Sequence, residues 1–314
     1  MNIPQLALGD IHPSDLDATC REWGCFALYG HDIDAALIKE VLQQSRVFFR
    51  QPPNAKNRIR RSARNSWGYY DAELTKNRPD WKEIIDIGPP VNSGPLAGSH
   101  PQWPDIAGFE TCMQTLQQQM HAVALHVLDA LGNALEADED LRHPFAEHSS
   151  FLRLNFYPPC PDPAADDATW SPEGRQFGIS HHTDAGAVTV LLQDEHAGLQ
   201  MYHKRHWYTV PPSPGALIIN IGDVVQVWSN DRYPAPLHRV LASSDTERIS
   251  LPYFLNPGYA YDYAPLNTGF AAQDPPRYAP INWGYFREQR SAGDYADYGE
   301  EIQIANFALA NSQR

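Results

Sequence analysis

Two residues of metal-binding type, His182 and Asp184, stand two positions apart in a stretch typical of a β-strand, and His238 follows at a distance. Side chains alternate between the two faces of a strand, so residues 182 and 184 project from the same face and can bind one ion. Two imidazoles and one carboxylate leave about half of an octahedron open, the arrangement of non-haem Fe(II) sites that activate O₂. The three residues therefore predict an iron site on a β-sheet scaffold.

The residues around this triad predict the scaffold itself. The runs 187–192, 224–228 and 249–254 are rich in β-branched and aromatic side chains, and we expect each of them to form a strand. From residue 150 onward, short runs of this kind are separated by Gly, Pro and Asn, as in an antiparallel barrel or jelly roll. The expected fold is mostly β with flanking helices and a double-stranded β-helix, or jelly-roll, core.

A second group of residues lies just beyond the last histidine. Arg248 and Ser250 share one strand face, and a guanidinium fork beside a hydroxyl is suited to binding a carboxylate through charge-assisted hydrogen bonds. Phe254 has the same parity and should face the barrel interior with them, unless Pro252 introduces a bulge. These residues predict an anchor for an acid near the iron.

The first half of the chain carries helical signals instead. We expect a helix over residues 15–23, capped by Ser14, and a second helix over residues 32–49 that ends before Pro52. Apolar residues spaced by three or four between residues 111 and 135 predict a longer amphipathic helix that lies against a sheet. One catalytic unit with a helical lead-in is the expected organisation.

Composition excludes several other classes of function. A net charge of -14 and an isoelectric point near 5.3 oppose binding of nucleic acid through a broad basic surface. No apolar run reaches the roughly 18 residues that a membrane helix needs, and the first residues lack the features of an export signal. The four cysteines form no paired framework, which is typical of reduced thiols in a cytoplasm. We expect a cytoplasmic protein without a membrane or nucleic-acid partner, and its oligomeric state stays open.

Over residues 3–260 the chain resembles the isopenicillin N synthase-like family of Fe(II)/2-oxoglutarate-dependent oxygenases. The resemblance rests on four stretches, residues 154–161 (LNFYPPCP), 182–186 (HTDAG), 214–230 (PGALIINIGDVVQVWSN) and 248–257 (RISLPYFLNP). Residues 3–4, 23–28 and 80–83 of the amino-terminal half agree as well.

The resemblance implies an organisation and a reaction. Residues 1–149 would form a helical and strand region that packs on the barrel, and residues 150–314 would form the jelly-roll dioxygenase domain. His182, Asp184 and His238 would bind Fe(II). With 2-oxoglutarate as cosubstrate and O₂ as oxidant, a small organic molecule would be oxidised, and succinate and CO₂ would be released.

The resemblance also implies roles for single residues in cosubstrate binding. Arg248 and Ser250 would bind the distal carboxylate of 2-oxoglutarate, and Tyr157 would donate a further hydrogen bond to it. Asn155 would lie near the metal end of the same molecule.

Three aromatic residues are the candidates for the substrate pocket. Phe254 matches a residue of the pocket wall in the family, and Trp67 and Tyr70 are expected to form another wall. For Phe254 and Trp67, ordinary packing in the core is an equally good interpretation.

Several members of the family remain compatible with these motifs. In penicillin-forming members, which use no 2-oxoglutarate, the Arg248 and Ser250 positions hold the carboxylate of the substrate itself, and Gln313 is similar to their carboxy-terminal glutamine. Ser66 stands where those enzymes carry an arginine, which disfavours tripeptide cyclisation. Ascorbate-using oxidases and ethylene- or succinate-forming oxygenases share the motifs, and hydroxylation, desaturation and ring closure are all open. A protein of another class, a non-catalytic sensor of 2-oxoglutarate or a metabolite, would not need three open metal positions.

Overall fold

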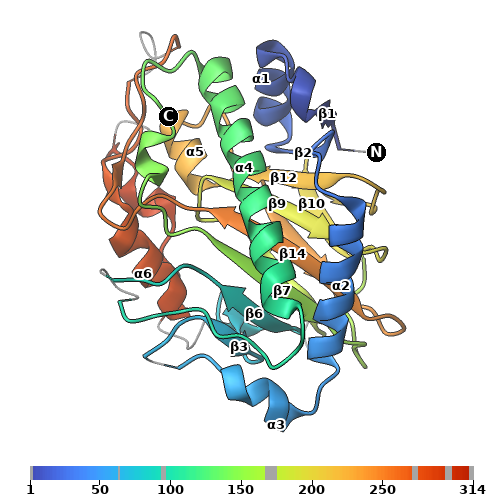
Figure 1. Ribbon diagram of the computed structural model, residues 1–314. Coiled ribbons are helices and arrows are strands. Elements are labelled where there is room, and N and C mark those ends of the chain that lie inside the picture. Colours follow the sequence, from blue (N-terminus) through green and yellow to red (C-terminus); the bar gives the residue numbers. More distant parts are fainter. Residues whose placement is uncertain are drawn as a thin grey trace.

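The structure is a computed structural model that describes residues 3–62, 64–92, 97–166, 175–270, 275–293 and 299–310. Two β-sheets form the core, and the long helix α4 (Phe109–Leu135) crosses one face of the larger sheet, with α2 (Ala35–Phe49) beside it (Figure 1). The predicted fold class, a jelly roll with flanking helices, is confirmed.

The larger sheet has eight strands in the order β1-β2-β12-β9-β14-β7-β6-β3. Their bounds in this order are Gln5–Ala7, Cys25–Tyr29, Leu217–Ile221, Val188–Gln193, Arg248–Leu255, Phe151–Tyr157, Glu83–Ile87 and Gly68–Tyr70. The smaller sheet has the order β11-β10-β13-β8, with bounds His206–Thr209, Leu199–His203, His238–Leu241 and Phe177–His182. Two short two-stranded sheets complete the strands of the described residues, β4 (Leu74–Thr75) with β5 (Arg78–Pro79) and β15 (Asp262–Tyr263) with β16 (Ile281–Asn282).

The remaining α-helices of the described residues are α1 (Pro13–Glu22), α3 (Pro53–Lys56), α5 (Asp223–Trp228) and α6 (Trp283–Gly293), and the other helical segments there are short 3-10 turns. Helix α4 has the predicted amphipathic pattern, and its buried side chains include Met113, Leu116, Met120 and Val127. Each fully buried side chain of this kind contributes about 1.5–3 kcal/mol, so the packing of α4 on β9 and β14 holds the larger sheet in place.

The first helix begins earlier than predicted, and the predicted cap is wrong. His12, not Ser14, is the N-cap, and Pro13 occupies the first helical position, where its missing N–H is no loss. Asp17 accepts hydrogen bonds from Arg232 Nε (2.8 Å) and from the Tyr233 hydroxyl (2.9 Å). This carboxylate therefore ties α1 to the segment that follows α5.

Strand β14 runs without a bulge. Its pairing with β9 keeps one register from Ser250, opposite Gln193, to Leu255, opposite Val188. Pro252 therefore does not shift the alternation, and Arg248, Ser250 and Phe254 face the same cavity, as predicted.

The prediction of a strand over residues 224–228 is wrong, because these residues form the short helix α5. Val224, Val225, Val227 and Trp228 are all buried, so neither a helical nor a strand period is visible in the run. Tertiary contacts decide the conformation. The backbone N–H groups at the helix start bond to carbonyls of the segment that follows β8, from Gly222 to Ala187 (2.8 Å) and from Asp223 to Asp184 (2.8 Å).

The predicted division between residues 149 and 150 stays a prediction. Strand β7 begins at Phe151, but β1, β2, β3 and β6 from the first half belong to the same sheet as β7, β9, β12 and β14. The largest core cluster likewise joins residues of both halves, such as Phe26 and Leu251.

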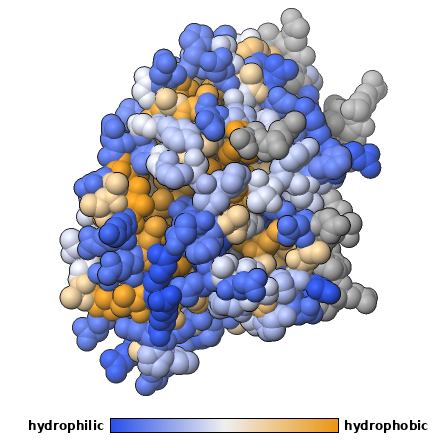
Figure 2. Space-filling model, turned by 90° about the vertical axis from the view of Figure 1, so that its right-hand side faces the viewer, coloured by the Kyte–Doolittle hydropathy of each residue, from blue (hydrophilic) through white to orange (hydrophobic). Residues whose placement is uncertain are grey.

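Figure 2 shows one face of the molecule, on which hydrophilic residues predominate and hydrophobic residues are visible between them. Among the described residues, the large hydrophobic side chains that are exposed are Val47, Phe270, Tyr285 and Leu309. In the part of the chain that the structure describes, no helix is both long enough and apolar enough to cross a membrane.

A close backbone contact at Gly222 generates the first prediction. A Cβ at this position would lie 2.2 Å from the Gly186 carbonyl oxygen and 2.8 Å from that of Asp184. Gly222→Ala should therefore lower the free energy of unfolding by about 1–3 kcal/mol in urea denaturation, the range for overpacking a tight site. The matched control is Gly9→Ala, because a Cβ there meets no described atom within 4 Å. A loss no larger than that of the control would show that the contact is not tight.

Candidate metal centre and active site

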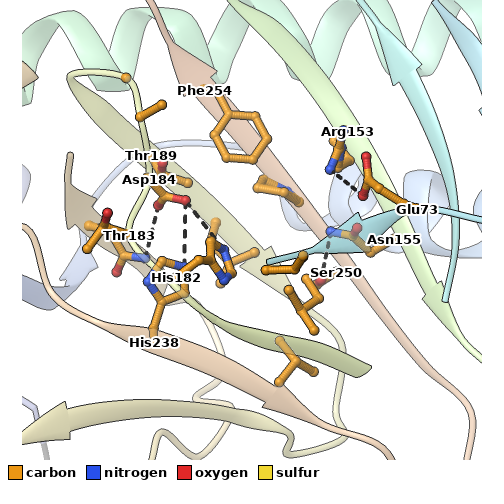
Figure 3. A pocket seen from close by; sticks show the side chains of 18 of the residues that line it. Glu73, Arg153, Asn155, His182, Thr183, Asp184, Thr189, His238, Ser250 and Phe254 are labelled. Carbon is orange, nitrogen blue, oxygen red and sulfur yellow. Dashed lines mark hydrogen bonds and ion pairs between the residues drawn. The ribbon is translucent and has the colours of Figure 1, made fainter. Parts of the chain in front are cut away.

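The three predicted metal ligands lie together at one end of the smaller sheet. His182 ends β8 and His238 begins β13, and the two residues are direct partners across this strand pair. Asp184 follows two residues after β8, and its Oδ1 lies 3.6 Å from His238 Nε2 and 3.9 Å from His182 Nε2. One ligand atom from each residue lies within 4.8 Å of the other two, and Figure 3 shows the side chains pointing toward one another.

Each histidine is held in one ring orientation by its own strand. The Nδ1 atoms lie 2.8 Å from the Ser180 carbonyl in His182 and 3.0 Å from the Pro236 carbonyl in His238. A carbonyl only accepts, so Nδ1 carries the proton and the Nε2 lone pair is free to bind a metal. Burial, followed by the proximity of His238, holds the pKa of His182 well below its usual value, which favours the neutral ligand form.

Asp184 is buried and is oriented by its surroundings. Asn220 Nδ2 on β12 donates to Asp184 Oδ2 over 3.4 Å, and the Asp223 N–H donates to the Asp184 carbonyl over 2.8 Å. The Val224 N–H reaches the Gly186 carbonyl over 3.1 Å. The turn that carries the carboxylate is thus fixed by the first residues of α5, where free N–H groups are available.

The predicted acid anchor lies on β14 and β7 in the same cavity. Arg248 is opposite Tyr157, and Ser250 is opposite Asn155. The guanidinium carbon of Arg248 lies 5.2 Å from the centre of the Tyr157 ring, and Asn155 Nδ2 lies 3.5 Å from Ser250 Oγ. The structure therefore brings all four predicted cosubstrate residues together.

Arg248 has spare hydrogen-bonding capacity although it is buried. Its Nη2 donates to Gln193 Oε1 (2.8 Å) and its Nε donates to the His196 carbonyl (3.2 Å), whereas Nη1 has no partner among the described residues. The carbonyl oxygens of the Asn155 and Asn220 side chains also have no partner there. Unpaired buried polar atoms are costly, so an N–H and two amide oxygens in this cavity indicate a place for a polar ligand.

One cavity contains the triad, the acid anchor and Phe254. The rings of Phe254 and Phe151 lie 4.9 Å apart and form an apolar wall on β14 and β7. Phe254 is paired with Thr189, which is paired in turn with Asn220 beside Asp184. Phe254 of the aromatic wall is therefore in one cross-strand row with Asn220, which bonds to Asp184 of the triad.

Trp67 and Tyr70, which we expect to form another wall of the pocket, are not among the described residues that line this cavity. Trp67 is 2% exposed, lies 5.5 Å from the Phe151 ring and donates through Nε1 to the Pro89 carbonyl. Tyr70 lies under the guanidinium groups of Arg60 and Arg61. Trp67 packs behind the wall, in agreement with the alternative core interpretation, and Tyr70 packs against two arginines, of which Arg61 is buried.

A buried ionic group in the cavity wall was not foreseen. Glu73 Oε2 lies 2.7 Å from Lys82 Nζ and 2.9 Å from Arg153 Nη1, and all three residues line the cavity. Burial disfavours the charge on Glu73, but the neighbouring cations outweigh burial and hold its pKa below the usual range. Arg153 alternates with Asn155 and Tyr157 on one face of β7, so strand parity could have placed it, whereas Glu73 and Lys82 carry no periodic signal.

Helix α6 supplies the other unforeseen lining residues, Trp283, Arg287 and Arg290. They lie about a hundred residues after His182, where the sequence shows no motif that connects them with the triad.

Known families match this chain in two places. Residues 148–257 match the 2OG-Fe(II) oxygenase superfamily, and residues 13–106 match the family described as non-haem dioxygenase in morphine synthesis N-terminal. Gibberellin 20 oxidase 2 of Oryza sativa subsp. indica is 34% identical over 76% of this chain, and the match spans 61% of the length of that protein. Gibberellin 2-beta-dioxygenase 6 of Oryza sativa subsp. japonica is 32% identical over 91% of this chain and 76% of its own length.

A solved structure has the same architecture. JOX2, crystallised in complex with 2OG, Fe and JA, is similar with a TM-score of 0.82 and 27% identity, over 98% of this chain and 90% of JOX2. The similarity extends through both sheets and the helices that flank them.

The geometry of the triad predicts a specific loss on substitution. His238→Ala removes one of three clustered ligand atoms. Loss of a residue that only supports a ligand weakens metal binding by up to roughly a hundredfold, so loss of a ligand itself should weaken the binding of Mn(II) or anaerobic Fe(II) by at least that factor. Equilibrium titration of the purified protein measures this. His206→Ala is the matched control, since His206 is exposed on β11 of the same sheet. Equal metal affinity in the two variants would contradict the assignment of His238.

Proposed function

Because the chain belongs to the 2OG-Fe(II) oxygenase superfamily, we propose that it is a non-haem Fe(II)- and 2-oxoglutarate-dependent dioxygenase. Its substrates would be O₂ and a small organic molecule, and its coproducts would be succinate and CO₂. The observation that carries the proposal is one cavity in which His182, Asp184 and His238 converge and the buried Arg248 has an N–H without a partner.

The donor set fits Fe(II). His182, Asp184 and His238 would hold the ion from one side, and their oxygen and imidazole nitrogen atoms are of the type that Fe(II) accepts in this arrangement. When bound, Fe(II) supplies the capacity to activate O₂ for oxidation of a carbon–hydrogen bond and for oxidative decarboxylation of a 2-oxo acid. The protein contributes two imidazoles oriented by backbone carbonyls, a carboxylate held by Asn220, and a cavity that also contains Arg248.

The cosubstrate residues fit an acid. Arg248 Nη1 would donate to the distal carboxylate of 2-oxoglutarate, and the Ser250 hydroxyl beside it would donate a further hydrogen bond. The Tyr157 ring packs against the guanidinium group and would hold it in place for the acid. Asn155, one strand away from Ser250, would contact the same ligand through its side-chain amide.

The substrate would contact Phe254 and Phe151, whose rings form the apolar wall near Asp184. The names of the relatives refer to gibberellins, flavonoids and other small organic compounds, so we carry over only the general class, a small organic molecule with an apolar carbon skeleton.

Two alternatives use the same residues differently. A penicillin-forming or ascorbate-using oxidase would place a substrate carboxylate on Arg248. Ser66 does not line the cavity, which disfavours the former, and Gln313 lies outside the described residues. Ethylene- or succinate-forming oxygenases share the 2-oxoglutarate chemistry and stay compatible with the site, whereas a sensor would have no use for the open side of the triad.

We also propose a cytoplasmic location. All four cysteines are free and buried, and burial raises the pKa of Cys112 to about 11, so these thiols act as apolar core groups rather than as disulfide partners. This fits a reducing compartment.

Substitution of the anchor tests the proposal. Arg248→Lys keeps the charge but loses the fork, and the loss of one charge-assisted hydrogen bond weakens binding roughly tenfold to a hundredfold. We expect calorimetry on the Mn(II)-loaded protein to show this loss for 2-oxoglutarate, and we expect the wild-type Fe(II) enzyme to form succinate from 2-oxoglutarate.

Arg239→Lys is the matched control, because Arg239 is a buried arginine that does not line the cavity and packs on Phe177 and Trp207. Unchanged affinity in Arg248→Lys would move the acid anchor elsewhere. A wild-type enzyme that oxidises its substrate without 2-oxoglutarate would favour the penicillin-forming or ascorbate-using alternative.

The aromatic wall generates a stability prediction. Tyr253 is fully buried on the opposite face of β14 from Phe254, which lines the cavity. Tyr253→Ala should lower the free energy of unfolding by about 3–5 kcal/mol, the range for truncating a large core side chain, and Phe254→Ala should lower it by less. Urea denaturation of the two variants decides this. Equal losses would identify Phe254 as a core residue.

A further inference from the structure

Helix α6 presents one face to the cavity. Trp283, Arg287 and Arg290 are spaced four and three residues apart, so they lie along one side of the helix, and all three line the cavity. Trp283 and Arg290 are buried. A helix far from the triad in sequence thus closes the same space as the triad.

Arg290 reaches from this helix to the metal turn. Its Nη2 donates to the carbonyl of Thr183 over 3.1 Å, and Thr183 is the residue between His182 and Asp184. The other atoms of the fork hold Arg290 in place, since Nε lies 2.9 Å from Glu301 Oε1 and Nη1 donates to the Ile302 carbonyl over 3.2 Å. The planar guanidinium group of Arg290 therefore bonds to three different residues at once.

The carbonyl that Arg290 holds is well placed to control ligand geometry. The peptide between His182 and Asp184 sets the relative direction of the two side chains, because they follow from the same short stretch of backbone. Helix α5 fixes the far end of this stretch through the Asp223 N–H, which bonds to the Asp184 carbonyl over 2.8 Å. Arg290 holds the near end of the same stretch through the Thr183 carbonyl.

We propose that Arg290 is a positioning residue of the metal centre, which ties helix α6 to the turn that carries two of the three metal ligands. The inference rests on the proposed function, since it assumes that the triad binds a metal. It means that one side chain connects the position of α6 beside the cavity with the geometry of the metal turn, whose other end is held by α5. Because Trp283 and Arg287 on the same face of α6 also line the cavity, the position of α6 would depend on the molecule that occupies the cavity.

The test uses the full-length protein with Mn(II) or Co(II) as the metal probe. Arg290→Met removes the fork, and we expect the metal dissociation constant to rise roughly tenfold to a hundredfold, the range for one hydrogen bond from a charged donor. The visible absorption of bound Co(II), which reports the arrangement of its ligands, should change as well. Arg290→Lys, which keeps the charge near Glu301 but loses the planar fork, should give an intermediate dissociation constant and would carry the test if Arg290→Met did not fold.

Arg232→Met is the matched control. Arg232 is also ion-paired, with its Nε 2.8 Å and its Nη2 2.9 Å from the Asp17 carboxylate oxygens, but it does not line the cavity. Its loss should lower the melting temperature and leave metal affinity and the Co(II) spectrum unchanged.

The outcomes separate this inference from the function on which it rests. If the wild-type protein binds no metal and His182→Ala makes no difference, the proposed function fails. If the wild type binds metal and the Arg290 variants have the same affinity and Co(II) spectrum, the inference fails while the function stands. A rise in dissociation constant that merely follows the loss in melting temperature, in Arg290 and Arg232 variants alike, would also overturn it.

Discussion

The backbone hydrogen bonds between the start of α5 and the turn after β8 fix the position on which the rest of the site depends. The N–H groups of Gly222, Asp223 and Val224 bond to the carbonyls of Ala187, Asp184 and Gly186. Such groups at a helix start have no partner inside the helix, so they are available to hold another segment. They place the Asp184 carboxylate against the histidines of β8 and β13, and Gly222 permits the close approach because it has no Cβ.

The register of the larger sheet then sets the distance from the metal end to the acid anchor. Along β14, Arg248, Ser250, Pro252 and Phe254 face the cavity in an unbroken alternation, and β7 matches them with Tyr157, Asn155, Arg153 and Phe151. Arg248 and Ser250 therefore occupy one end of the row, and the rings of Phe254 and Phe151 occupy the other. This gradient suits a cavity that binds a small acid beside an apolar substrate.

Strand alternation explains why much of this site could be predicted from the sequence. It places Arg248 with Ser250 on one face of β14. Alternation also predicted that His182 and Asp184 face one ion, but Asp184 lies in the turn after β8 and is held there by the start of α5. Alternation fails for α5, because Val224, Val225 and Val227 are buried on all sides and leave no period to detect. Trp67 shows a related limit, since an aromatic residue indicates burial but not the layer in which it packs.

Other parts of the site depend on long-range contacts that no local pattern contains. Arg290 meets Thr183 across 107 residues of chain, and Glu73 meets Arg153 across 80. No periodicity in the sequence predicts either pair. Each contact can be recognised only in the folded structure, once the helices and short strands are placed around the two sheets. The family resemblance predicted the chemistry of the centre, whereas the elements around it had to come from the structure.

In the proposed reaction the triad and Arg248 act together, and O₂ is consumed with 2-oxoglutarate. Mass spectrometry of the succinate that the Fe(II) enzyme forms under ¹⁸O₂ measures this. We expect succinate that carries one labelled oxygen atom, because one atom of O₂ enters the new carboxylate during oxidative decarboxylation. Unlabelled succinate, or no succinate from an enzyme that still oxidises its substrate, would contradict it.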